Sequence, residues 1–485
     1  MNILDIAIIL AYFVGMIVLG LYANRKQSNV DDYYLGGRSM GSIKLGALWM
    51  AGWIGGSSVI GTSSNGYSMG ITAVWYVLSI ALGCMIFAFT MAKPIKRVSN
   101  ELNNITFPEL IRYRYDTKNS VMSSITTILA MIGYTAAQFV AGASILHVLT
   151  GWGLGTCYIL AAVVIVFYVS TGGLLAVTYT DMIQMALLLV GVVFLAVPIC
   201  IHTLSESGVT LAQALPESYF NLGSWGWSTI LALGLSTILS FFTSMDSFTR
   251  CIAAKDTRSA KVGTIYAAVA VLVIAGASTY LGMAGKVILP ELSSSNNVLA
   301  QLVVTIFPHG LKGLILVGVL SAIMSTADIS VLTGSASLTK DIYQQFINPN
   351  ASEKTIMHMG IVCSVIVGVL GAVFGWFSQD IINILLITFT INSAGLFLPT
   401  VGAFFWKRSC SAGAFASMVS AIVVTVIWLI GGKVTDLAIF SIDALWPALA
   451  VSAVLYFAIC LTHKQTEEEL QQAERFYAAG KSECN

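Results

Sequence analysis

Three carboxylates interrupt long apolar stretches of this sequence. We place three acidic residues, Asp181, Asp246 and Asp328, inside apolar helices. A charged side chain at the centre of a bilayer costs about 2.5–3.5 kcal/mol on insertion scales, so such residues generally bind ions or solutes. We therefore treat each of the three aspartates as a candidate site residue.

The stretch 45–70 carries a second chemical signal. Its apolar run is interrupted by Gly52 and by the sequence GGSS at 55–58. Glycine weakens a helix, and unwound backbone survives at membrane depth only where protein, water or an ion satisfies the freed carbonyl groups. The stretch therefore predicts a broken membrane helix that lines a binding cavity. A helix-packing seam of small residues is the alternative.

The composition indicates an all-α membrane protein that crosses the bilayer many times. Hydrophobic residues make up 57% of the 485 residues, charged residues only 10%, and the mean hydropathy is +0.84. Soluble domains of this length do not have such a composition, and roughly 20 apolar residues span a bilayer. We predict about thirteen membrane segments, at residues 3–23, 45–70, 72–92, 120–150, 157–172, 174–201, 228–252, 262–285, 311–336, 356–378, 381–405, 412–431 and 444–462.

The basic residues orient these segments. If the N-terminus lies outside, an odd number of spans places the C-terminus in the cytoplasm. All but three of the 24 Lys and Arg residues then lie on the cytoplasmic side, and the exceptions are Lys286, Lys312 and Lys433. Because this distribution follows the positive-inside rule, we expect a multi-pass protein of the plasma membrane in this orientation.

The eight cysteines give no sign of a bound metal. None has the spacing of metal ligands, and no pair on the outside indicates a disulfide. Cys410 falls in a predicted cytoplasmic loop and Cys484 in the C-terminal tail, whereas the other six fall in or at the ends of membrane segments. We expect the cysteines to fill apolar space.

Several separated motifs resemble those of the sodium:solute symporter family. The run DDYYLGGRS at 31–39 is similar to the entrance motif of that family. Within the family, the chain resembles the high-affinity choline transporters at further places, and the resemblance covers almost the whole chain. The matching motifs are WIGG at 53–56, GT at 61–62, GGL at 172–174, VTYTD at 177–181 and AIMSTAD at 322–328.

The resemblance implies a five-plus-five inverted-repeat core. Ten core helices would be preceded by one membrane helix and followed by two, and the first and sixth core helices would be broken. The polar run TSMDS at 243–247 would form the second break. The expected regions are a leading helix and connector (1–44), the first repeat (45–201), an outside loop (202–227), the second repeat (228–406), two further membrane helices (407–462) and a cytoplasmic tail (463–485).

The resemblance also implies a sodium site between two of these helices. Sodium is a hard cation that prefers oxygen ligands. Carbonyl groups freed by a broken helix and hydroxyl groups of an intact helix would supply them. The implied ligands are the carbonyl groups of Ala51, Ile54 and Ala322 and the hydroxyl groups of Ser325 and Thr326. As an alternative, the hydroxyl groups bond to carbonyl groups of their own helix.

The resemblance also points to a second cation site. In some relatives, an aspartate that matches Asp181 completes a second sodium site with residues that match Asp328 and Ile329. Ile329 has no side-chain ligand, but Asp328 could substitute. Two carboxylates near one ion would bind it tightly or share a proton. The alternative is that helix-end amides or a basic residue satisfy Asp181.

Asp246 supplies the clue to the transported solute. A carboxylate opposite the first break favours an ammonium group, and aromatic faces would complete such a pocket by cation–π attraction. The chain has Ala136 and Met245 where the choline pattern has tryptophan, which favours a primary amine, a polyamine or a cationic amino acid. The candidate substrate residues are Trp53, Trp75, Tyr76, Tyr134, Gln138, Phe242, Asp246 and Asn392. As an alternative, Asp246 pairs with Arg250 four residues later.

These observations favour a secondary active transporter that couples inward sodium movement to uptake of a small organic cation by alternating access. If Asp246 were tied to Arg250, proline, another zwitterionic amino acid or a carboxylate nutrient would be preferred. A membrane enzyme or sensor is disfavoured, because the chain has no phosphate loop and no metal-spaced His/Cys set. The expected partners are the solute, sodium and the lipid bilayer, with no nucleic acid. The oligomeric state stays open.

Overall fold

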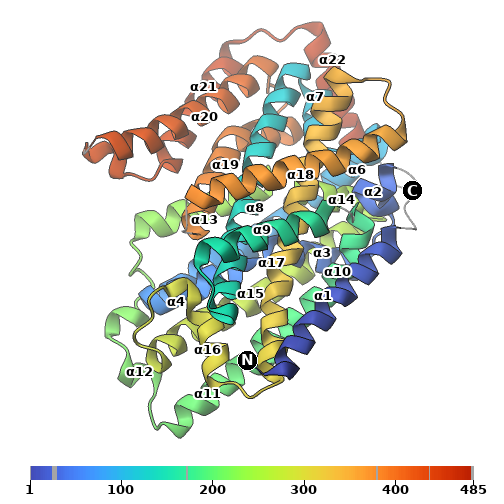
Figure 1. Ribbon diagram of the computed structural model, residues 1–485. Coiled ribbons are helices and arrows are strands. Elements are labelled where there is room, and N and C mark those ends of the chain that lie inside the picture. The colour runs from blue at the N-terminus through green and yellow to red at the C-terminus, as the bar shows by residue number, and fades with distance from the viewer. Residues whose placement is uncertain (1, 25–29, 171–172, 378–380, 436, 482–485) are drawn as a thin grey trace.

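Helices form all the regular structure of the residues described by the computed structural model, which are 2–24, 30–170, 173–377, 381–435 and 437–481 (Figure 1). Each of the thirteen predicted segments coincides with one helix or with consecutive helices. Ten helical runs in the described ranges are long and apolar enough to cross a membrane. This number is lower than the predicted thirteen for two reasons. The run Ser57–Thr90 joins two predicted segments, and α1 and α9 have shorter apolar runs. The predicted all-α, multi-pass fold class is confirmed.

Most membrane segments are single helices. They are α1 (Ile3–Asn24), α5 (Val74–Thr90), α8 (Thr117–Thr150), α9 (Leu154–Ser170), α15 (Thr257–Ile288), α17 (Leu311–Ala336), α18 (Glu353–Phe377), α19 (Ile381–Phe405), α20 (Ser411–Val434) and α21 (Leu445–Thr462). One segment runs through α10 (Gly173–Leu188), η4 (Leu189–Ala196) and α11 (Val197–Glu206), and α17 continues into η7 (Ser337–Ile347). Gly172 of the GGL motif lies outside the described residues, as do Arg25 and Lys26.

Two membrane helices are broken, as predicted. The first consists of α3 (Ser42–Trp53), a wide turn η2 (Ser57–Gly61) and α4 (Thr62–Met69). Ile54 ends α3 with φ −104° and ψ 82°, which is not a helical conformation. The second consists of α13 (Trp227–Phe241) and α14 (Met245–Ala253), and Ser244 between them is extended, with φ −75° and ψ 122°. Each break therefore frees backbone groups in the middle of a membrane segment.

The unbroken helix α17 lies in the centre of the bundle. It packs against α1, α3, α8, α10 and α18, and every residue from Ile315 to Ala336 is buried. Its polar residues therefore face other helices and not lipid. Ser325, Thr326 and Asp328 are placed inside the protein for this reason.

The second half of the first broken helix is fixed against α15 by two glycines. A Cβ atom at Gly282 would lie 2.2 Å from the carbonyl oxygen of Ser63, and one at Gly66 would lie 2.7 Å from that of Thr279. Only glycine permits this approach of backbone to backbone. The Ser63 hydroxyl also donates to the Ser278 carbonyl at 2.9 Å. α4 is thereby held to α15. The break at residues 54–56 precedes η2, so it lies outside this tightly packed contact.

The bundle has two distinct ends, which we call the α22 end and the α12 end (Figure 1). The α22 end is formed by α2 (Val30–Leu35), η1 (Gly36–Arg38), α6 (Ala92–Leu102), α7 (Phe107–Arg114) and α22 (Glu467–Lys481). The α12 end is formed by η3 (Gly70–Ala73), α12 (Leu211–Ala214), η5 (Glu217–Phe220), η6 (Ser295–Asn297) and α16 (Val298–Ile306). A last short turn, η8 (Ala438–Ser441), joins α20 to α21. α22 packs on α6, α7 and α19.

Candidate functional site

The first break lies directly against the hydroxyl pair of α17. The Thr326 hydroxyl donates to the Ala51 carbonyl at 2.6 Å, and the Ser325 hydroxyl lies 3.5 Å from the same oxygen. Ser325 also donates to Ala322 of its own helix at 3.1 Å. Four of the five predicted sodium ligands are therefore in mutual contact. The back-bonding alternative applies to Ser325 in part and does not apply to Thr326.

The fifth predicted ligand, Ile54, lies at the end of α3, next to this contact. Its amide donates to the Met50 carbonyl at 2.7 Å, which is the last bond of the helix. The next residue, Gly55, is pressed against α17, because a Cβ there would lie 2.5 Å from the Thr326 hydroxyl oxygen. All the potential ligands at this point are uncharged oxygens, which is a donor set suited to a hard monovalent cation.

Side chains of α8 support the unwound backbone. The Tyr134 hydroxyl donates to the Gly52 carbonyl at 2.9 Å, and the Gln138 side-chain oxygen accepts from the Gly56 amide at 2.8 Å. The Ser58 hydroxyl donates to the Trp53 carbonyl at 2.8 Å. Tyr134 and Gln138 are thus brought to the break on one face of α8, as their spacing predicted. Both contact backbone groups, so they hold the break in shape.

Asp246 is paired with Arg250, which is the alternative left open by the sequence. Arg250 Nη1 donates to one Asp246 oxygen and the Ser244 hydroxyl donates to the other. Arg250 Nε donates to the Leu48 carbonyl at 3.0 Å, and the guanidinium lies 5.0 Å from the centre of the Trp49 ring. Both side chains are buried. The carboxylate that we expected to meet an ammonium group therefore already has a cationic partner.

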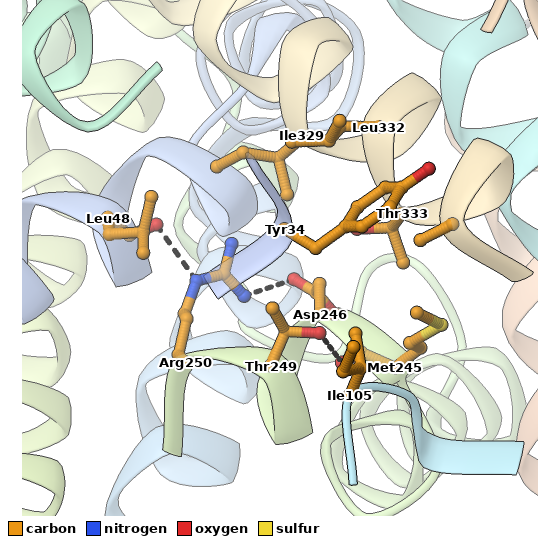
Figure 2. A pocket seen from close by; sticks show the side chains of 11 residues that line it. Tyr34, Leu48, Ile105, Met245, Asp246, Thr249, Arg250, Ile329, Leu332 and Thr333 are labelled. Atoms are coloured by element: carbon orange, nitrogen blue, oxygen red, sulfur yellow. Dashed lines mark hydrogen bonds and ion pairs between the residues drawn. The ribbon is translucent and has the colours of Figure 1, made fainter. Parts of the chain in front are cut away.

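A cavity adjoins this ion pair on the side of the α22 end. Figure 2 shows Arg250 between Leu48 and Asp246, with Tyr34 and Leu332 across the cavity. The enclosed space is about 20 Å³, which is room for about one water molecule. A solute would require this space to widen.

A second cavity opens from the α12 end. It has a volume of about 420 Å³ and lies beside the second half of the first broken helix. Hydroxyl and amide side chains line it, together with two isoleucines of α19. These lining residues include Ser64, Asn65, Ser68, Ser295, Ile381 and Ile382.

Aromatic rings fill the space between the two breaks. The Trp53 ring stacks on Phe241 with centroids 3.8 Å apart, and it lies 6.3 Å from Tyr134 and 5.9 Å from Phe389. Tyr134 and Phe389 are also 5.9 Å apart. Of these four rings, the sequence analysis singled out Trp53 and Tyr134. It missed Phe241 and Phe389 because an apolar ring in an apolar helix carries no signal of its own.

The remaining predicted substrate residues are distributed around the site. Tyr76 is buried, with its hydroxyl 3.4 Å from that of Ser57. Phe242 lies at the second break and packs edge-on against Phe87 and Phe397. Asn392 lies one turn beyond Phe389 on α19, and its side-chain oxygen is buried without a partner in the part of the chain that the structure describes.

Trp75 is not brought together with the others. Its indole N–H donates to the Leu222 carbonyl at 3.0 Å, and its ring lies 6.1 Å from that of Trp227. Leu222 lies in the connection that precedes α13 and Trp227 is the first residue of α13, so both contacts lie at the α12 end. Trp75 and Tyr76 are neighbours at the start of α5 and point in different directions. Tyr76 is buried in the interior, whereas Trp75 is directed toward the α12 end.

Asp181 of α10 and Asp328 of α17 lie on two helices that pack against each other. Both are fully buried and interact electrostatically. Within the described ranges, none of their four carboxylate oxygens has a hydrogen-bond partner, and neither do Gln184 Oε1 and Ser321 Oγ. The hydroxyl of Tyr12 in α1 accepts from Gln184 at 2.9 Å and lies within electrostatic range of both carboxylates. No motif pointed to Tyr12, because α1 precedes the matched helices.

Comparison with known proteins gives one family match and several relatives. A family model described as "Sodium:solute symporter family" matches residues 33–421. The chain is 27% identical over 478 residues to a protein described as a sodium/proline symporter from Staphylococcus aureus (strain JH9), and the alignment covers 93% of this chain and 91% of the relative. A protein of the same description from strain N315 matches equally well.

Two solved structures share the fold over nearly their whole length. One is the substrate-bound, outward-open state of a Na⁺-coupled sialic acid symporter, with a TM-score of 0.80, 20% identity, and coverage of 96% of this chain and 99% of that chain. The other is Mhp1, a nucleobase-cation-symport-1 family transporter in a closed conformation, with a TM-score of 0.58, 17% identity, and coverage of 92% and 98%. Both support the inverted-repeat architecture.

Removal of one partner of the Asp246–Arg250 pair is expected to lower the free energy of unfolding strongly. Asp246→Asn and Arg250→Gln each leave one buried charge unpaired, which costs about 3–5 kcal/mol. The double variant removes both charges and should cost less than the sum of the single variants. Thermal unfolding of the purified protein in detergent measures these costs.

A surface pair provides the control for this cycle. The Lys255 ammonium and the Asp256 carboxylate lie 3.9 Å apart, and the two side chains are 59% and 50% exposed. Lys255→Gln should therefore cost less than about 1 kcal/mol. Strictly additive effects of Asp246→Asn and Arg250→Gln would show that the two buried groups do not interact.

Proposed function

Because the chain belongs to the sodium:solute symporter family, whose model matches residues 33–421, we propose that it imports a small carboxylate-bearing solute, such as a zwitterionic amino acid, together with sodium. As a member of that family it is a sodium-coupled, multi-pass membrane symporter that works by alternating access. The choline-transporter-like subgroup indicated by the motifs is not supported, because the relatives reported above are sodium/proline symporters.

The observation that carries the substrate proposal is the ion pair in α14. The carboxylate of Asp246 is neutralised by Arg250 and also accepts from Ser244. An ammonium group would have to compete with a buried guanidinium for it. This arrangement argues against the organic cation preferred in the sequence analysis, and in favour of the alternative, proline, another zwitterionic amino acid or a carboxylate nutrient.

Arg250 also retains hydrogen-bonding capacity. Its Nη2 atom is buried and has no hydrogen-bond partner among the described residues. This nitrogen lies beside the first break, since a Cβ at Gly52 would be 1.7 Å from it. A guanidinium binds carboxylates well because its donors form a planar fork. A solute carboxylate that reached this point would satisfy the spare donor.

The proposed sodium site consists of the oxygens at the contact of α3 with α17. Ala51, Ile54, Ala322, Ser325 and Thr326 supply the ligands, and the direct bond between Thr326 and Ala51 supports the assignment. A tenfold sodium gradient contributes about 1.4 kcal/mol per ion, and a membrane potential of 100 mV adds about 2.3 kcal/mol per charge. One ion can therefore drive substantial accumulation.

Asp181 and Asp328 are proposed as a second cation site. Two buried carboxylates without hydrogen-bond partners are costly unless a positive charge balances them. Their separation from any described hydrogen-bond donor supports this proposal. The alternative in which helix-end amides satisfy Asp181 is disfavoured on the same ground.

We further propose that the α22 end faces the cytoplasm and the α12 end faces outward. The basic connectors, α6 and α7 among them, lie at the α22 end. Solute would then enter through the polar cavity beside α4 and leave through the cavity beside Arg250 and Tyr34. Movement of the broken helices against their surroundings would open each path in turn.

Removal of both α17 hydroxyls is expected to raise the sodium requirement. For Ser325→Ala combined with Thr326→Ala, the sodium concentration for half-maximal uptake should rise about tenfold or more, which corresponds to about 1.4 kcal/mol. Uptake into proteoliposomes at graded sodium concentrations measures this. Ser364→Ala is the control, because that hydroxyl donates within its own helix α18, to the Gly360 carbonyl at 2.9 Å. An unchanged sodium dependence would remove the assigned site.

The substrate class is tested by thermal stabilisation. Purified protein is heated with proline, other zwitterionic amino acids, sialic acid, choline or polyamines, each with and without sodium. Carboxylate-bearing solutes should stabilise it only with sodium, by about 2.7 kcal/mol at a hundred times the dissociation constant. Stabilisation by amines that lack a carboxylate, and not by amino acids, would favour the organic-cation hypothesis.

The second cation is counted by current. With a solute of zero net charge, each transported molecule carries one charge per sodium ion, so we expect two charges per solute. Asp181→Asn should reduce this to about one, because a single carboxylate in an apolar site no longer favours a second cation. Glu206→Gln is the control, since Glu206 is exposed near the α12 end. One charge per solute in the unmodified protein would contradict the second site.

A further inference from the structure

Two cysteines far apart in the sequence meet at the α22 end. The sulfur atoms of Cys410 and Cys460 lie 3.4 Å apart, and the Cys410 amide donates to Cys460 Sγ at the same distance. Cys410 immediately precedes α20, whereas Cys460 lies near the end of α21. Gly413 makes room for the pair, because a Cβ there would lie 2.4 Å from Cys460 Sγ. The sequence analysis treated both as apolar filler.

The surroundings activate Cys410. The hydrogen bond with Cys460, the Gly413 amide at the start of α20 and the charge of His463 lower the pKa of the Cys410 thiol below its usual value, although burial acts in the opposite direction. The thiolate is the nucleophilic form of cysteine. The pair is buried, but the neighbouring Arg408 and Ala412 are exposed. Cys410 therefore lies within two residues of the exposed surface along the chain.

We propose that Cys410 and Cys460 form a reversible, peroxide-responsive disulfide that regulates transport. The Cys410 thiolate attacks one oxygen of hydrogen peroxide, the O–O bond breaks, and hydroxide leaves to become water. The Cys460 thiol then attacks the resulting sulfenic sulfur and releases a second water. Two thiols are oxidised and one peroxide is reduced. The sulfur atoms must approach by roughly 1.3 Å to reach the length of a disulfide bond.

The bond would act on the turn that precedes α20. Arg114 Nη2 donates to the Ser409 carbonyl at 3.0 Å, and the Tyr115 hydroxyl lies 2.5 Å from that of Ser409. In α7, the ring of Phe107 contacts that of Phe248 of α14, with centroids 4.4 Å apart and the ring planes tilted by 47°. α14 is the half-helix that carries the Asp246–Arg250 pair. A disulfide would therefore restrict the motion of the turn that holds α7, and α7 packs on the half-helix α14.

The disulfide itself is tested by peptide mapping. The full-length protein in a Cys484→Ser background is treated with hydrogen peroxide, free thiols are blocked, and the digest is analysed by mass spectrometry. We expect a Cys410–Cys460 cross-link that dithiothreitol reverses, and no cross-link in Cys460→Ser. Cys363→Ser is the control, since Cys363 lies in α18, and it should cross-link like the parent. Complete alkylation of both cysteines after peroxide would overturn the proposal.

The regulatory effect is tested by uptake, and this measurement rests on the proposed function. Peroxide should slow sodium-driven uptake about two- to tenfold, the range expected for coupling between packed elements. Dithiothreitol should restore the rate, and Cys410→Ser and Cys460→Ser should be insensitive. A cross-link without any change in rate would overturn the regulation. Uptake that fails even before peroxide would instead count against the proposed substrate, because the cross-link is measured independently.

Discussion

The structure depends on how unwound backbone is satisfied in the middle of a membrane bundle. The carbonyl group of Ala51, freed where α3 ends, accepts from Thr326 on the unbroken helix α17. Tyr134 and Gln138 satisfy further groups of the break. An unpaired backbone group at this depth would cost several kcal/mol, so the break can exist only where α8 and α17 supply partners. The oxygens that stabilise the break include the ligands of the proposed sodium site, so ion binding there would be linked to helix shape through the same atoms.

The three membrane aspartates illustrate how identical residue types acquire different uses. Asp246 is neutralised within its own helix by Arg250, which is also anchored to Leu48 and Trp49 of α3. The ion pair thus joins the two broken helices to each other. Asp181 and Asp328 lie on two helices that pack together, and their carboxylate oxygens have no hydrogen-bond partner among the described residues. Asp246 thus has a structural role that leaves one nitrogen of Arg250 available to a solute. The arrangement of Asp181 and Asp328 instead suits the binding of a cation.

The aromatic rings and the cavities suggest how solute could be enclosed. Trp53, Phe241 and Phe389 occupy the space between the two breaks. The polar cavity lies on the side of the α12 end, and the small cavity beside Arg250 lies on the side of the α22 end. Trp53 is the last residue of α3 and Phe241 the last residue of α13, so any movement of the broken helices during alternating access would carry these rings with it.

The sequence by itself determined the membrane architecture, the positions of both helix breaks and the pairing of the Ser325–Thr326 motif with the first break. The apolar runs and the first break follow from local properties of the chain, namely long apolar stretches and the glycine and serine within one of them. The second break and the pairing of Ser325 and Thr326 with the first break were implied by the resemblance of the motifs to those of the family. It could not determine the partner of Asp246, because an ammonium ligand and Arg250 at helical spacing are equally compatible with the sequence. The tertiary structure decided this through the Leu48 carbonyl and the Trp49 ring, which fix the guanidinium in place. It also decided the aromatic neighbours of Trp53 and the meeting of Cys410 with Cys460, since such contacts join residues whose separation in the sequence carries no record of their proximity.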